Sequence, residues 1–244
     1  MKGTTFIKPL ELNIRIAGES WSQGDVISGL LIIKNHGTQA ASLQDNRVSL
    51  AYGRLKKVHE KAEGAYKILS TVSLQSIPEL QPGKEFEFPW KFEMDRNAPI
   101  TDNVKSLFIL YGSEAAPGHL QLPIQPYWTV LEFLEVFKVG FRFVVKSKKA
   151  NKDSVEVKLA PPDGAKAYAA LELCTLFFHF EGDTMNVEYV FLQKKIQASA
   201  ASVDVTKQKK AFEQSFAQNQ ILLESGRFNH EPIEAAIRDA LAQL

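Results

Sequence analysis

Residues 85–94 carry the feature that most constrains the fold of this chain, an alternation of apolar and polar side chains. One face of the pattern is apolar and largely aromatic: Phe86, Phe88, Trp90, Phe92 and Met94. Side chains alternate between the two faces of a β-strand, so the pattern predicts a half-buried strand. Pro82-Gly83 predicts a tight turn before it. Because Pro89 has no N–H to donate, the strand must lie at an edge, carry a bulge or pair on its other side at that position.

The rest of residues 1–124 reads as a succession of short strands separated by turn residues. The expected strands lie at 12–16, 26–34, 47–55, 66–74 and 104–111. Many short strands at near-regular spacing are typical of a β-sandwich. We therefore predict an N-terminal β-sandwich domain over residues 1–124.

The pattern changes after Pro126, where polar residues recur at every third position of 127–138. This spacing favours a helix that is apolar on most sides, although the aromatic and β-branched residues would also suit a strand. We predict a linker helix over 125–139, packed between two domains. Four of its residues are expected to make the interdomain contacts: Trp128, Leu131, Leu134 and Phe137.

A smaller β domain is expected over 140–200, and a helical tail over 201–244. The domain contains a predicted hairpin of 171–180 with 185–192, and Ala/Ser-rich residues 197–205 suggest a linker. In the tail, Phe212, Phe216 and Leu223 suggest one apolar helical stripe. A second helix follows from the apolar spacing of 233–244. We expect this last helix to pack on its own chain, with homo-oligomerisation or partner binding as alternatives.

Composition indicates a cytoplasmic protein with no global attraction to nucleic acid. The chain has 244 residues, with 29 Lys and Arg against 28 Asp and Glu. The single cysteine, Cys174, excludes an internal disulfide and fits a reducing compartment. No secretory signal is recognised at the N-terminus, and no apolar run approaches the roughly 20 residues of a membrane span, so stable membrane insertion is not expected.

The residues that could carry chemistry form no recognisable site. The five histidines show no metal-ligand spacing, and no phosphate-binding glycine motif or nucleophile motif is present. We therefore predict no catalytic residue, no metal and no cofactor, and we expect Cys174 to be a core residue. An enzyme would become credible only if a pocket brought His179 to a carboxylate.

Basic residues cluster in four short segments: 54–57, 146–152, 194–195 and 207–210. Solvated loops or strand ends are the simpler interpretation of these clusters. If several met on one face, they could instead bind acidic peptides or lipid headgroups.

Two segments resemble arrestin-like proteins. Residues 21–33 follow the family outline of an aromatic residue, Gly24-Asp25 and then Gly29 before an apolar strand, with Gln23 where proline is usual. Residues 80–92 are similar to the family pattern Leu-x-Pro-Gly-x-x-x-Phe-Pro-Phe-x-Phe, with Trp90 in place of a phenylalanine.

The bacterial sporulation-control (SpoOM-like) branch of these proteins is a closer match. Its Pro-led helix with a Leu-Glu pair resembles Pro126 followed by Leu131-Glu132, and its Gly-Phe-Arg resembles 140–142. The resemblance covers roughly residues 12–195 and leaves the tail unassigned. It implies a mainly β, two-domain arrestin-like sandwich, with a C-terminal domain that looks abbreviated.

The same resemblance implies a non-enzymatic adaptor or regulatory scaffold that binds protein partners, for instance in bacterial developmental or stress regulation. Such proteins bind through sheet edges, concave faces or loops, but no partner-binding residue can be carried over to this sequence. The alternative is a carrier of a small apolar ligand or lipid, with residues 86–92 lining its cavity. An enclosed cavity of about 300 Å³ or more under Trp90 would favour the carrier.

Overall fold

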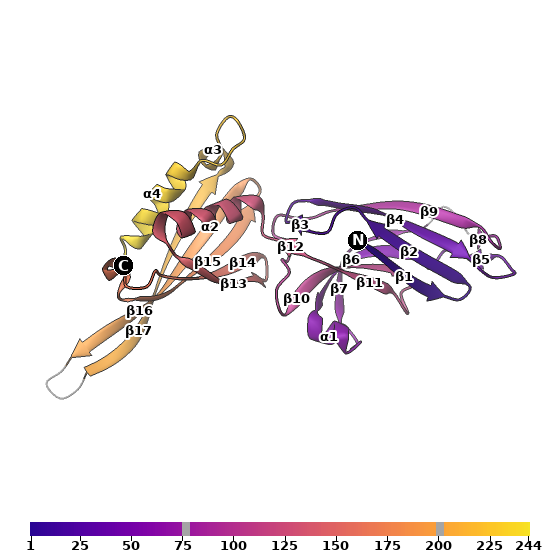
Figure 1. Ribbon diagram of the computed structural model, residues 1–244, viewed down its shortest axis with the longest axis horizontal. Coiled ribbons are helices and arrows are strands. Elements are labelled where there is room, and N and C mark those ends of the chain that lie inside the picture. Colours follow the sequence, from indigo (N-terminus) through magenta and orange to yellow (C-terminus); the bar gives the residue numbers. More distant parts are fainter. Residues whose placement is uncertain (75–78, 199–202) are drawn as a thin grey trace. The chain divides into compact units, whose positions relative to one another are not determined.

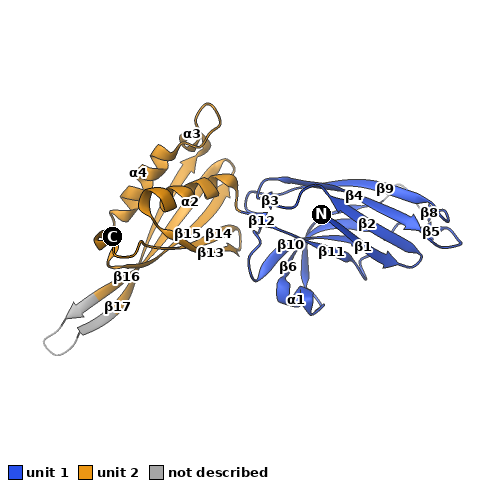
Figure 2. Ribbon diagram, in the orientation of Figure 1, with its two compact units in different colours: residues 1–125 blue, residues 126–244 orange. Residues whose placement is uncertain are grey.

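The computed structural model describes residues 1–74, 79–198 and 203–244, whose elements are shown in Figure 1. The chain divides into two compact units, Met1–Gln125 and Pro126–Leu244 (Figure 2). Strands predominate in both units, so the predicted mainly β fold is confirmed.

The first unit is a sandwich of two four-stranded antiparallel sheets. The first sheet has the order β1 (Lys2–Ile7), β2 (Leu10–Ile16), β4 (Val26–Asn35), β9 (Glu85–Glu93). The second has the order β11 (Gly118–Leu122), β10 (Lys105–Gly112), β6 (Arg47–Arg54), β7 (Tyr66–Ser73). Two short pairs complete the unit: β3 (Trp21–Ser22) with β12 (Ile124–Gln125), and β5 (Ala41–Ser42) with β8 (Glu79–Leu80).

The core of this unit lies between the two sheets. Fully buried aliphatic side chains come from one face of each sheet: Leu12, Ile14, Leu31 and Ile33 from the first, Val48, Leu107 and Ile109 from the second. A smaller cluster of Ala51, Phe108 and Leu110 lies apart from this core. It is covered by α1 (Leu55–His59) through Leu55 and Val58, and by Tyr66.

Strand β9 has the alternation predicted from the sequence. Trp90 and Phe92 are buried in the core, whereas the glutamates between the aromatic residues are exposed. Among the described residues, the strand pairs only with β4 and so lies at a sheet edge, which accommodates Pro89 as expected. Gly29 faces Trp90 across the two strands. A Cβ at position 29 would overlap the backbone carbonyl oxygen of Arg15 and would lie 2.6 Å from Cζ2 of the indole.

The second unit is a five-stranded antiparallel sheet in which consecutive strands are neighbours. Its strands are β13 (Val144–Asn151), β14 (Ser154–Ala160), β15 (Leu171–Glu181), β16 (Thr184–Ala198) and β17 (Val203–Ala217). The helical elements are α2 (Trp128–Phe141), η1 (Lys166–Tyr168), α3 (Gln218–Ile221) and α4 (His230–Leu241). Helices α2 and α4 lie on the same face of the sheet (Figure 1).

Helix α2 confirms the helix predicted after Pro126, with a C-terminal end at Phe141 in place of residue 139. Among the four residues expected at a domain interface, Leu134 and Phe137 are buried, and Trp128 and Leu131 are half-buried. Phe137 stacks against aromatic rings of its own unit, those of Phe133, Phe141, Phe143 and Tyr189. The role of these four residues between domains stays a prediction.

The helical prediction is wrong for residues 203–217, which form strand β17. Phe212 and Phe216 lie opposite Tyr189 and Met185 of β16. Residues four apart share a face in a strand as well as in a helix, so their spacing could not distinguish the two. Leu223, the third residue of the predicted stripe, is exposed after α3. In the predicted linker, residues 197–198 and 203–205 belong to strands, and 199–202 lie outside the described residues.

The last helix of the tail is confirmed as α4, whose apolar face is buried on its own chain. Ile233, Ile237, Ala240 and Leu241 are buried, and α4 packs beside α2. Gln214 Nε2 of β17 donates a hydrogen bond to the Ala236 carbonyl at 3.1 Å. Asn229 caps the helix by accepting a hydrogen bond from the Glu231 N–H.

Gly29→Ala should lower the free energy of unfolding by about 1–3 kcal/mol, because the new methyl group would overlap the backbone carbonyl oxygen of Arg15 and the Trp90 indole. Gly140→Ala is the matched control, since a Cβ there meets no atom within 4 Å and the residue is helical. It should raise the free energy of unfolding by about 0.5–1 kcal/mol. Chemical denaturation measures both values, and equal effects would contradict the proposed contact.

Phe133→Ala should lower the free energy of unfolding by about 3–5 kcal/mol. The ring is fully buried and contacts the rings of Phe137, Phe178, Tyr189 and Phe216. The control is Val139→Ala on the same helix, where the side chain is 70% exposed and the expected change is within about 0.5 kcal/mol. A loss below 1 kcal/mol for Phe133→Ala would show that α2 contributes little to the core.

Candidate functional site

The edges of the sheets differ in how far their side chains discourage pairing with another chain. Strands β1 and β11 lie against each other, so a Cβ at Gly3 would be 3.0 Å from Leu120. The β9 edge carries Pro89 and exposed glutamates. Edges β13 and β17 each carry three lysines: Lys146, Lys148 and Lys149, and Lys207, Lys209 and Lys210. Proline and lysine at an edge hinder the addition of a further strand.

Strand β7 has neither kind of protection along most of its length. Among the described residues it pairs only with β6. Its eight residues include one charged side chain, Lys67, and no proline or glycine. Ile68 and Leu69 are 48% and 42% exposed. An edge with unpaired backbone groups and exposed β-branched or apolar side chains is a template for an added strand.

A β-bulge shapes the middle of this edge. Ile68 lies opposite Ala51 and Ser70 lies opposite Leu50, so Leu69 is the extra residue. After the bulge, the hydroxyl oxygens of Thr71 and Ser49 are 2.9 Å apart, which ties β7 to β6. Bulges bend a strand locally and redirect its side chains. The bulge therefore places Leu69 at the exposed edge without interrupting the pairing on either side.

The segment that leads into β7 is basic. Residues 54–67 contain five exposed cationic side chains, Arg54, Lys56, Lys57, Lys61 and Lys67, against two acidic ones, Glu60 and Glu63. Lys56 and Glu60 lie 3.9 Å apart as an i,i+4 pair on α1. The charge at this end of β7 therefore favours an acidic neighbour over a basic one.

We define the β7 edge as the candidate site, comprising the exposed side of residues 66–73. The sequence predicted the strand but did not single out Ile68 and Leu69. The available signal was a strand with one charged residue among several apolar ones, beside the basic run 54–57.

Three of the five histidines make polar contacts with other side chains or with the backbone. His36 Nε2 lies 2.5 Å from Glu11 Oε2, and His230 Nε2 lies 3.2 Å from Glu132 Oε2. Hydrogen bonds from the Asn13 side chain and from His36 hold the pKa of Glu11 below its usual value. His179 Nδ1 lies 2.7 Å from the backbone carbonyl of Asp153, so its partner is not the carboxylate that an enzyme would need. Within the described ranges, no His, Cys, Asp or Glu residues form a metal-binding group of three.

The aromatic face of β9 is not part of four surface depressions formed by described residues. These depressions have volumes from about 410 to about 620 Å³, and no residue of β9 lines them. Trp90 and Phe92 pack into the sandwich core. The enclosed cavity that would favour a carrier is therefore not among these depressions.

Two of the three basic clusters of the second unit are neighbours, and the third lies apart from them. Lys194 of β16 lies directly opposite Lys207 of β17, so the clusters 194–195 and 207–210 meet. The lysines of 146–152 belong to β13 and the turn after it, whereas those of 207–210 belong to β17. These strands are opposite edges of the same sheet, separated by β14, β15 and β16. The longest helix in the described part of the chain, α2, has 14 residues and is too short to cross a membrane.

Comparison with known proteins identifies a solved structure with the same fold. No family model matches the sequence, and no curated protein matches it. The structure is similar to the crystal structure of Spo0M, sporulation control protein, from Bacillus subtilis, with a TM-score of 0.68 and 15% identity. The match covers 97% of this chain and 99% of Spo0M. A β-glucosidase from intestinal bacteria aligns with a TM-score of only 0.28. The chain thus has the fold of Spo0M, as the sequence resemblance implied.

Cys174 should react with a thiol reagent only after unfolding. The side chain is fully buried on β15, and burial raises the pKa of the thiol, so the reactive thiolate is disfavoured. With 5,5′-dithiobis(2-nitrobenzoate) at pH 8, the folded protein should release almost no chromophore, and the protein in denaturant should release one equivalent. Rapid labelling of the folded protein would contradict the assignment of Cys174 to the core.

Proposed function

We propose that this protein is a non-enzymatic adaptor that binds extended segments of protein partners along the β7 edge. The observation that carries the proposal is the exposure of Ile68 and Leu69 on an edge strand with a single charged residue. A partner strand would pair with the free backbone groups, and its alternate side chains would contact these two residues.

The proposal is supported by the contrast between β7 and the other sheet edges. Pro89 lies on β9, and lysines lie on β13 and β17. These residues hinder strand addition at low cost to the fold. An unprotected edge on a soluble sandwich would promote aggregation unless a partner or a weak intrinsic affinity limits it.

We further propose a regulatory role in a bacterial cytoplasm, in development or stress. The support for this part is the fold shared with Spo0M, which is described as a sporulation control protein. The fold alone does not identify a binding partner. Self-association through α4 is a weaker proposal, because its apolar side chains are buried on its own chain.

Ile68→Lys combined with Leu69→Lys should abolish strand addition while preserving the fold. Peptides selected from a random display library against the full chain should bind this double variant at least tenfold more weakly. Both side chains are exposed, so the free energy of unfolding should change by less than about 1 kcal/mol. Hydrogen–deuterium exchange should show that a selected peptide slows exchange of the β7 amides.

The matched control is Phe6→Lys combined with Val26→Lys, which places two lysines at exposed apolar positions of the opposite sheet. The control should bind the selected peptides as the unmodified chain does. Peptides that bind all three proteins equally, or that protect amides elsewhere, would refute the β7 edge as the binding site.

A further inference from the structure

A second surface, independent of the β7 edge, combines two arginines with an apolar depression. It lies in the second unit where α2 and α4 end, has a volume of about 490 Å³, and includes the loop around η1. Its apolar lining includes Phe141, Tyr168 and Leu241. Arg142 and Arg238 also line it, and no acidic side chain does.

Arg238 is held in place by two contacts. Its guanidinium carbon lies 5.7 Å from the centroid of the Phe141 ring, and Nη2 lies 2.5 Å from Glu234 Oε1. A guanidinium has five N–H donors in a rigid plane, so the pair with Glu234 leaves donors for another acceptor. The cation–π contact with Phe141 favours a position of the guanidinium beside the depression.

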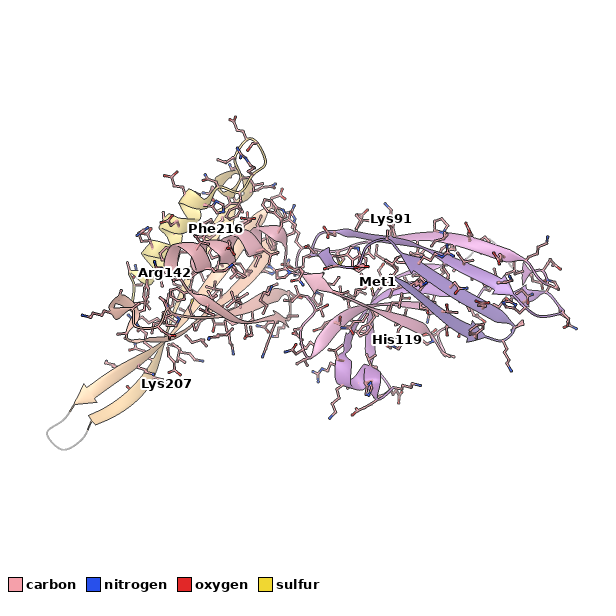
Figure 3. All side chains as sticks on the ribbon, viewed as in Figure 1. Met1, Lys91, His119, Arg142, Lys207 and Phe216 are labelled. Carbon is pink, nitrogen blue, oxygen red and sulfur yellow. The ribbon has the colours of Figure 1, made fainter. Side chains whose placement is uncertain are left out.

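Arg142 follows the last turn of α2 in a left-handed conformation, with φ of 59°. The Phe143 N–H closes the helix end by donating to the Phe137 carbonyl at 3.1 Å. Glycine is the usual residue in this conformation at a helix end, because a side chain there is disfavoured. Arg142, labelled in Figure 3, has an exposed side chain that makes no hydrogen bond or ion pair with any described residue. Its guanidinium is therefore available to a ligand.

We propose that this depression binds a carboxylate carried on an apolar or aromatic body. The planar carboxylate matches the forked donors of a guanidinium, and the body would contact Phe141, Tyr168 and Leu241. A single negative charge suits the site better than a phosphate dianion for two reasons. Glu234 already offsets part of the charge of Arg238, and the carbonyl ends of α2 and α4 lie nearby and oppose negative charge.

The carboxylate could belong to a free organic acid or to the C-terminus of a polypeptide, and two probes distinguish these sources. NMR titrations of the full chain would use phenylacetate and the tripeptide Gly-Gly-Phe with a free C-terminus. Either probe should give saturable shifts at the amides of 139–144 and 238–242, and the tighter probe identifies the source. Phenylacetamide, which lacks the charge, should bind at least tenfold more weakly than phenylacetate.

Arg142→Gly and Arg238→Gln should each weaken phenylacetate binding at least tenfold, whereas Arg227→Gln, at an exposed arginine outside the depression, should not. Arg142→Gly should also raise the melting temperature, because glycine suits the left-handed conformation. Equal affinities for phenylacetate and phenylacetamide, or unchanged binding by both pocket variants, would overturn the proposal. Tighter binding of phenyl phosphate than of phenylacetate would overturn the assignment to a carboxylate.

Discussion

Close packing around the backbone of Gly29 constrains how the first sheet is built. Gly29 of β4 faces Trp90 of β9, and a Cβ at position 29 would overlap both the indole and the backbone carbonyl oxygen of Arg15 on β2. A slip of one residue would turn Trp90 and Phe92 to solvent and bring glutamates into the core. The buried Trp90 Nε1 has no hydrogen-bond partner among the described residues. The missing hydrogen bond lowers the free energy of unfolding by about 1–3 kcal/mol, and the burial of the large indole ring offsets this loss.

The second unit covers its sheet with helices instead of a second sheet. The rings of α2 meet those of three strands, with Phe133 packed between Phe178, Tyr189 and Phe216. The abbreviated C-terminal domain implied by the resemblance thus has a physical basis, because α2 and α4 supply the second layer. Residues 203–217 form a strand because β16 needs a partner on that side. Without β17, one side of β16 would lack backbone hydrogen-bond partners along its length.

Sequence periodicity predicted the elements whose pattern has a single interpretation. The alternation of β9 and the apolar stripe of α4 are such cases, and both are confirmed. Phe212 and Phe216 fit either period, and the sheet that decides between them is formed by distant residues. The sequence did not predict the candidate sites, because these sites also depend on residues that are distant in the chain. The exposure of Leu69 depends on its edge position and on the bulge, and the cation–π contact of Arg238 with Phe141 joins residues far apart in the chain.

The distribution of edge protection is the strongest link between this fold and a binding role. Lysines at the edges of the second sheet keep that sheet from pairing with other chains, and Pro89 does the same for β9. Lys67 is the one charged residue on β7, and the fold could accept further charges at Ile68 and Leu69, because these two side chains contribute little to the core. Their apolar character therefore has no structural requirement. The binding function proposed for the β7 edge would account for it, and the net positive charge of the exposed residues 54–67 would favour an acidic partner there.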